Sequence, residues 1–179
     1  MLSSRPSPAE ITAQHQTNVA TMSSIKSKVS PLKAAATNLA ETARQLKDYS
    51  TQLERNGQRQ VTSPNGDRVA TKDLTRSLKM AKDAIKGLES KVSSLDREVD
   101  FFSAHQIGLL QGNVRAVPPG DKVRWCTGQV NKIQQRTNRL AQSEQSTAAN
   151  SVRTIQNSAY VLGRPAVSTN LPTLLADLA

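Results

Sequence analysis

The residue types that most often perform catalysis or bind metals are few in this 179-residue chain, and they lie far apart. There are two histidines, His15 and His105, and a single cysteine, Cys126, which has no CxxC partner. A zinc site needs several Cys, His or carboxylate ligands at short spacing. The sequence therefore predicts no metal and no other cofactor. We expect His15 to be an interfacial or surface residue and Cys126 to be a small buried hydrophobe.

The carboxylates give no better indication of catalysis. Asp96, Glu98 and Asp100 follow the pattern of a solvated helix face, with no apolar setting that would prepare one of them as a general acid. The chain also lacks a glycine-rich phosphate loop and a GxSxG nucleophile elbow. We expect a protein that is not an enzyme.

The charge balance points to binding. Lys and Arg number 24 against 14 Asp and Glu, and half of the net charge of +10 falls between residues 114 and 162. Such a segment can neutralise the phosphates of a nucleic acid or an acidic protein surface, although a solvated helix face is the simpler interpretation. Trp125 is the only candidate there for stacking on a base. The candidate polyanion-binding residues are Arg115, Lys122, Arg124, Lys132, Arg136 and Arg139.

A short leucine pattern marks the C-terminal tail, residues 163–179. The segment Leu171-Pro172-Thr173-Leu174-Leu175 matches the LxxLL spacing of helices that insert leucines into a partner's groove. Packing back on its own chain is the simpler alternative. The candidate partner-docking residues are Leu171, Leu174, Leu175 and Leu178.

The elements that must position these groups are long helices with heptad spacing. One pattern runs from Met22 to Leu53, and another runs from Val123 to Leu162 with a one-residue shift typical of a stutter. The cleanest pattern lies between them and predicts a helix–helix or oligomer seam of Leu74, Leu78, Ile85, Leu88, Val92, Leu95, Val99 and Phe102. We expect helical arms at about 10–55, 72–111 and 122–162, after a disordered tail at 1–9.

Proline and glycine residues indicate where the helical segments are interrupted. Ser30-Pro31 has the form of a helix start, so we expect a break or kink between segments 10–29 and 31–55. Turn residues at Ser63-Pro64-Asn65-Gly66 lie between two short β-prone stretches, which predicts a small hairpin. A second connection follows Gly112 and Pro118-Pro119-Gly120.

The expected fold is all-α: an elongated coiled-coil helical hairpin or three-helix bundle with flexible termini. Only five residues are aromatic, and a narrow seam has little room for rings. We expect Phe101, next to the seam, to be buried against the third helix, with an oligomer contact as the alternative. An antiparallel hairpin would place Lys26, Lys28 and Lys33 beside Asp100, Glu98 and Asp96. The alternative is a parallel dimer in which Lys91 meets a partner's Asp96.

These patterns support three functional hypotheses. The first is a non-catalytic structural or assembly protein that joins copies of itself or other helical proteins as a scaffold or filament subunit. The second is a nucleic-acid or polyanion packaging protein, viral or chromatin-like, that uses the third helix. The third and weakest is an exported filament or translocation-apparatus component. No apolar run approaches the roughly 20 residues of a membrane span, so we expect a soluble protein, intracellular or within an assembled particle, with signal-less export left open.

Overall fold

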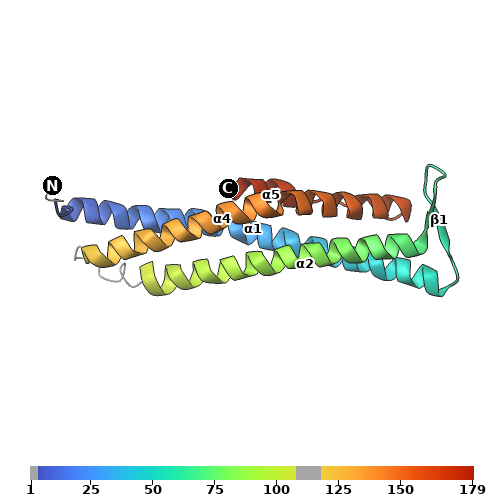
Figure 1. Cartoon of the computed structure of the whole chain (residues 1–179), viewed down its shortest axis with the longest axis horizontal. Helices are drawn as coiled ribbons and strands as arrows, with labels where there is room; N and C mark the ends of the chain where they lie inside the picture. Colours follow the sequence, from blue (N-terminus) through green and yellow to red (C-terminus); the bar gives the residue numbers. More distant parts are fainter. Residues whose placement is uncertain (1–3, 108–117) are drawn as a thin grey trace.

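The computed structural model describes residues 4–107 and 118–179, and these are mostly helical, which confirms the all-α expectation. The three long helices are α1 (Pro8–Arg55), α2 (Thr71–Phe102) and α4 (Gly120–Val161). They contact one another along an elongated molecule in which α1 and α2 run in opposite directions (Figure 1). The shorter elements are β1 (Gln60–Thr62), β2 (Arg68–Ala70), the π-helical turn η1 (Ser103–Ile107) and α5 (Leu171–Asp177).

Helix α1 begins earlier than the expected residue 10. The side chain of Ser7 accepts a hydrogen bond from the Glu10 backbone N–H at 3.2 Å, and the Glu10 carboxylate accepts one from the Ser7 N–H at 2.7 Å. This reciprocal capping box satisfies two donors that have no partner within the helix. Pro8 fits the first helical position because that position needs no N–H. Within the tail expected at 1–9, residues 1–3 lie outside the described residues.

The break expected at Pro31 does not occur, because α1 continues through it to Arg55. A proline inside a helix costs about 3 kcal/mol through a lost hydrogen bond and a steric clash. Val29 and Leu32, on either side of it, are both completely buried. Burying such side chains contributes about 1.5–3 kcal/mol each. Tertiary packing on both sides of Pro31 therefore outweighs the local preference for a new helix start.

The hairpin predicted between the first two helices is present. Strands β1 and β2 are antiparallel, and Val61 lies opposite Val69. The turn between them is closed by a hydrogen bond from the Gly66 N–H to the Ser63 carbonyl at 2.9 Å. Gly66 has a φ of 92°, a conformation that favours glycine. This small two-stranded ribbon caps the far end of the α1–α2 pair.

The core is a long apolar strip between the helices. Every residue of the predicted second seam is buried within the chain, and Val92 and Val99 are completely inaccessible. The heptad positions of α1 from Met22 to Leu46 are buried on the facing side. Helix α2 ends at Phe102 and is followed by η1, whereas the second arm was expected to reach 111; residues 108–117 lie outside the described residues. Branched aliphatic and small side chains thus form most of the buried strip that the heptad pattern predicted.

Candidate functional site

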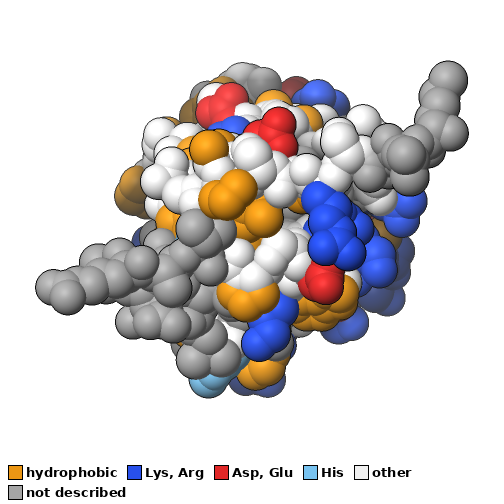
Figure 2. All heavy atoms as spheres, turned by 90° about the vertical axis from the view of Figure 1, so that its left-hand side faces the viewer, with side chains coloured by type: hydrophobic (Ala, Val, Ile, Leu, Met, Phe, Trp, Pro, Cys, Tyr) orange, Lys and Arg blue, Asp and Glu red, His pale blue; other side chains and the backbone are white. Residues whose placement is uncertain are grey.

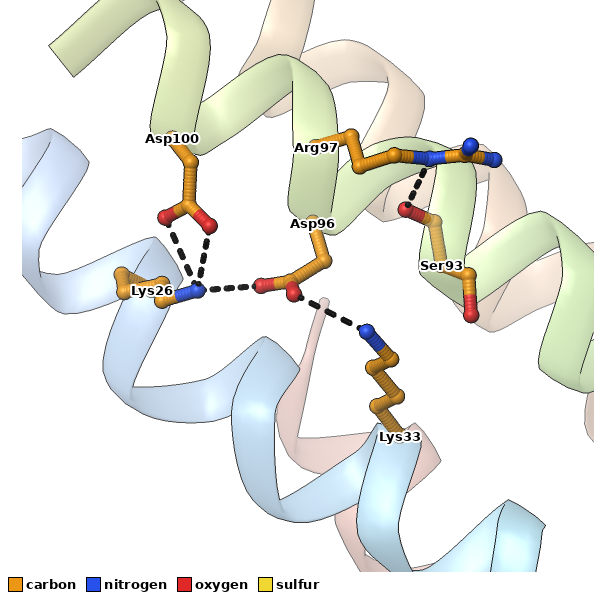
Figure 3. A network of polar contacts seen from close by, with 6 residues as sticks. All are labelled: Lys26, Lys33, Ser93, Asp96, Arg97 and Asp100. Carbon is orange, nitrogen blue, oxygen red and sulfur yellow. Dashed lines mark hydrogen bonds and ion pairs between the residues drawn. The ribbon is translucent and has the colours of Figure 1, made fainter. Parts of the chain in front are cut away.

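The best-defined polar site joins α1 to α2. Lys26 Nζ lies 2.6 Å from one Asp96 carboxylate oxygen and 2.8 Å from an oxygen of Asp100. Lys33 Nζ approaches the other Asp96 oxygen at 3.5 Å, so one carboxylate bridges two lysines that are two turns apart on α1 (Figure 3). Asp96 is buried, whereas its two lysine partners reach solvent. This geometry sets the register of the hairpin.

The protonation of this network follows from its contacts. The hydrogen bonds that Lys26 donates to Asp100 and Asp96 raise the pKa of its ammonium group. Burial of Asp96 opposes its ionised form, but the hydrogen bonds and charges of Lys26 and Lys33 outweigh that effect and lower the pKa of this carboxyl. Lys26 and Asp96 are therefore both charged near neutral pH, and their ion pair can fix the orientation of α1 on α2.

Two ion pairs of the described residues join α2 to α4. Lys91 pairs with the buried Glu144 of α4. Glu98, expected beside Lys28, instead pairs with Arg136 of α4. Residue spacing in a hairpin of two helices predicts which residues of those helices are level with each other. It does not predict which side of α2 a third helix will cover.

The basic residues of α4 are mostly on the surface. Lys122, Arg124, Lys132 and Arg139 are exposed, and no carboxylate among the described residues lies within 4.0 Å of their charged groups. Arg136 is the exception because of its pair with Glu98. Trp125 precedes Lys132 by seven residues and Arg139 by fourteen, which places the three side chains on one helix face. Arg115 lies outside the described residues.

Aromatic side chains gather where α2 ends and α4 begins. Phe101 is 60% exposed, which contradicts the expectation that it is buried, and its ring lies 4.7 Å from that of His105. Trp125 is 50% exposed, with its ring 6.2 Å from the buried ring of Phe102. The end view of the molecule shows apolar side chains beside a group of Lys and Arg side chains (Figure 2). The exposed rings of Phe101 and Trp125 form a candidate contact surface at this end of the molecule.

The leucine tail folds back on the chain. Leu171 and Leu175 are completely buried and Leu178 is nearly so, while Leu174 is partly buried. Helix α5 contacts α1 and α4, and the Gln145 side-chain amide donates a hydrogen bond to the Pro172 carbonyl at 3.3 Å. The docking residues predicted for a partner are therefore occupied within this chain.

The remaining candidate chemical groups are isolated. His15 is buried, and its Nδ1 has no hydrogen-bond partner. Cys126 is buried as expected, and that burial raises the pKa of its thiol. Across residues 4–107 and 118–179, no three His, Cys, Asp or Glu side chains are grouped to hold a metal ion. Within the same ranges, no helix has both the length and the apolarity to cross a bilayer.

Together, the fold and these surfaces define an all-α protein whose exposed aromatic and basic side chains are binding candidates. No family model, curated protein or solved structure matches this chain.

Proposed function

We propose that this protein is a non-catalytic coiled-coil assembly subunit that associates with copies of itself or with other helical proteins through its aromatic end. The observation that carries the proposal is the pair of exposed rings, Phe101 and Trp125, at one end of a long helical body. Aromatic residues are enriched at interfaces because each ring buries a large apolar area. The heptad spacing of α1, α2 and α4 supports a coiled-coil body that holds this end in place.

The test measures mass against concentration by size-exclusion chromatography with light scattering. We expect wild-type protein to form oligomers as its concentration rises, and Phe101→Ser combined with Trp125→Ser to shift the equilibrium to the monomer. Met80→Ser is the matched control, because Met80 is 67% exposed on α2 away from the aromatic end. A wild-type protein with the mass of one chain at every concentration, and with no helical protein bound after purification, would refute the proposal.

A second candidate function is polyanion binding by α4. It is supported by the exposed cations Lys132 and Arg139, which share a face with Trp125 and have no carboxylate partner among the described residues. Phosphates are attracted to such a face by a Coulombic force that salt screens. The same face also carries Arg136, whose pair with Glu98 would have to open or extend to a phosphate.

The test replaces Lys132, Arg136 and Arg139 by Gln and measures binding to a labelled DNA duplex over a range of salt. Each lost phosphate contact should reduce the slope of log K against log salt by about 0.9, so the slope should fall by up to about 2.7. The control replaces Lys72, Arg76 and Lys79, which have the same i, i+4, i+7 spacing on α2 and are also exposed. Equal losses in the two variants would show that α4 is not a specific site.

A further inference from the structure

Two Asn-Gly pairs lie at the hairpin end of the molecule, where α1 leads into β1 (Figure 1). Asn56-Gly57 directly follows α1, and Asn65-Gly66 lies in the turn between β1 and β2. All four residues are exposed. In such a pair the backbone nitrogen of glycine can attack the side-chain carbon Cγ of asparagine, because glycine has no Cβ to hinder the approach. The hydrogen bonds around each pair decide how readily it reacts.

The reaction is a deamidation that consumes only water. At Asn56-Gly57, the glycine nitrogen loses its proton and forms a bond to Asn56 Cγ, and the Cγ–Nδ2 bond breaks with release of ammonia, which takes up a proton. Water then opens the resulting five-membered succinimide at one of its two carbonyls. Opening at Cγ gives aspartate, whereas opening at the main-chain carbonyl gives isoaspartate, in which the chain continues through Cγ. Either product has a carboxylate in place of a neutral amide, and one ammonium ion is released.

The side chain of Asn65 is held by its neighbours. Its Oδ1 accepts hydrogen bonds from the Ser63 hydroxyl and from the Asp67 backbone N–H, the latter at 3.2 Å, and its Nδ2 donates one to the Asp67 carboxylate at 3.1 Å. The attacking nitrogen is held as well, since the Gly66 N–H donates to the Ser63 carbonyl at 2.9 Å. These bonds must open before Asn65 Cγ can turn toward the Gly66 nitrogen.

Asn56 is held much less. Within the described parts of the chain, its side chain makes no hydrogen bond. The attacking Gly57 N–H has one, to the Glu54 carbonyl at 3.0 Å. Asn56 has a ψ of 8°, and this torsion must rotate before the Gly57 nitrogen lies beside the Asn56 side chain. Nothing lies within 4 Å of where a Cβ on Gly57 would be, so the peptide has room to rotate when the end of α1 frays.

The residues after Asn56 join the end of α1 to the start of α2. The Gln58 N–H donates to the Leu53 carbonyl at 3.0 Å, and the Gln58 carbonyl accepts from the hydroxyl of the buried Thr71 at 2.8 Å. The Thr71 N–H also donates to the Arg59 carbonyl at 3.0 Å. An isoaspartate at position 56 adds one carbon to the main chain just before these bonds, and its carboxylate lies at the negative end of the α1 dipole. Both changes weaken the bonds to Thr71.

We propose that Asn56-Gly57 is a site of spontaneous deamidation, and that its conversion to isoaspartate loosens the connection between the end of α1 and Thr71. Asn65-Gly66 has the same two residue types and is protected by the folded hairpin. The chain itself is the substrate and water is the co-reactant. The modification therefore accumulates with the age of the protein and goes beyond the proposed assembly role.

The experiment ages the full-length protein in neutral buffer and follows both sites in the same molecules. Trypsin separates the two sites into peptides 56–59 and 60–68. Mass spectrometry then measures how much of each asparagine has become aspartate or isoaspartate. In the folded protein, Asn56 should convert at least about tenfold faster than Asn65, because fewer hydrogen bonds must open first. In urea, where the hairpin is unfolded, the two rates should become similar.

Hydrogen exchange tests the structural consequence. In molecules that contain isoaspartate at position 56, the Thr71 amide should exchange at least about threefold faster than in fresh protein. Asn56→Gln should abolish this effect of ageing, because the longer side chain would have to close a larger ring. Asn65→Gln is the matched control and should leave the effect of ageing unchanged.

Three results would overturn the proposal. The first is conversion of Asn65 in the folded protein that is as fast as that of Asn56, or faster. The second is a preference for Asn56 that persists in urea, because the local sequence rather than the fold would then select the site. The third is an unchanged rate of Thr71 exchange in molecules that contain the isoaspartate.

Discussion

Lys26 Nζ lies 2.6 Å from Asp96 Oδ1, across the interface between the first two long helices. These residues are 70 positions apart in the chain, and their contact fixes the register of α1 against α2. An apolar seam alone tolerates a shift by one heptad, because leucines and valines meet similar neighbours after such a shift. A buried carboxylate between two lysines penalises a shift, because its charge would lose its partners.

The Asp96 network predicts a specific dependence of stability on pH. Asp96→Asn should lower the free energy of unfolding by about 1 kcal/mol near neutral pH, a modest loss because water reaches Lys26 and Lys33. The folded state lowers the pKa of the Asp96 carboxyl, so its contribution is full above the unfolded pKa of about 3.9. That contribution is lost as the pH falls through the lower, folded pKa. Urea unfolding at several pH values should therefore show the difference between wild type and variant shrinking below about pH 4.

Asp83→Asn is the control for this experiment. Asp83 is exposed and pairs with Lys79 on the same helix, so its loss should change the free energy of unfolding by less than about 0.5 kcal/mol. If Asp83→Asn and Asp96→Asn had equal effects, the cross-helix contact would contribute nothing specific to stability.

The buried seam of α2 predicts a large loss of stability when a side chain is shortened. Leu88→Ala should reduce the free energy of unfolding by about 2–5 kcal/mol, because it removes apolar contacts and leaves a cavity. The exposed Met80→Ala on the same helix should change it by about 0.5 kcal/mol or less. Guanidinium unfolding followed by circular dichroism measures both. A small effect at Leu88 would mean that the seam is loosely packed.

Two glycines predict effects of opposite sign. Gly87 lies inside α2 with open space around its Cα, so Gly87→Ala should stabilise the protein by about 0.5–1 kcal/mol through the higher helix propensity of alanine. Gly163 has a φ of 65° just after α4, so Gly163→Ala should destabilise it by about 1 kcal/mol. Thermal melting of both variants beside the wild type gives the comparison. If Gly163→Ala stabilised the protein, that result would contradict the left-handed backbone conformation of residue 163 after α4.

The buried thiol predicts slow modification. Burial both shields Cys126 and raises the pKa of its thiol, so the reactive thiolate is scarce at neutral pH. Reaction with a thiol-specific disulfide reagent should be at least about tenfold slower in the folded protein than in urea. Ser146→Cys, made in a Cys126→Ala background, provides an exposed thiol on α4 as the comparison. Equal rates for the two thiols in the folded protein would show that the α4 seam opens readily.

Much of the local architecture was readable from residue spacing. The heptad positions from Leu74 to Phe102 and from Met22 to Leu46 predicted the buried strips, and turn chemistry around Asn65 and Gly66 predicted the β-hairpin. Pro31 was misleading, because a local rule about helix starts takes no account of the burial of Val29 and Leu32. Phe101 was misleading for a related reason. Its place beside the seam did not reveal that it lies on the uncovered side of α2.

The candidate binding surfaces depended more on how the third helix packs. Lys132, Arg136 and Arg139 share a face by spacing alone, but only the contact with α2 shows that Arg136 is already paired with Glu98. The leucines of α5 were visible as a motif, whereas the hollow beside Leu178 is formed by α1 and α4 together.

The sequence by itself determined the helices, because the period of apolar residues is a local property that selects one buried face for each segment. It also determined the net charge. Only the tertiary structure decided which helix covers which side of its neighbour, and so which charges are paired, which rings are exposed and where a hollow remains. Those outcomes depend on contacts between residues far apart in the chain, and a repeated heptad pattern allows more than one way to make them.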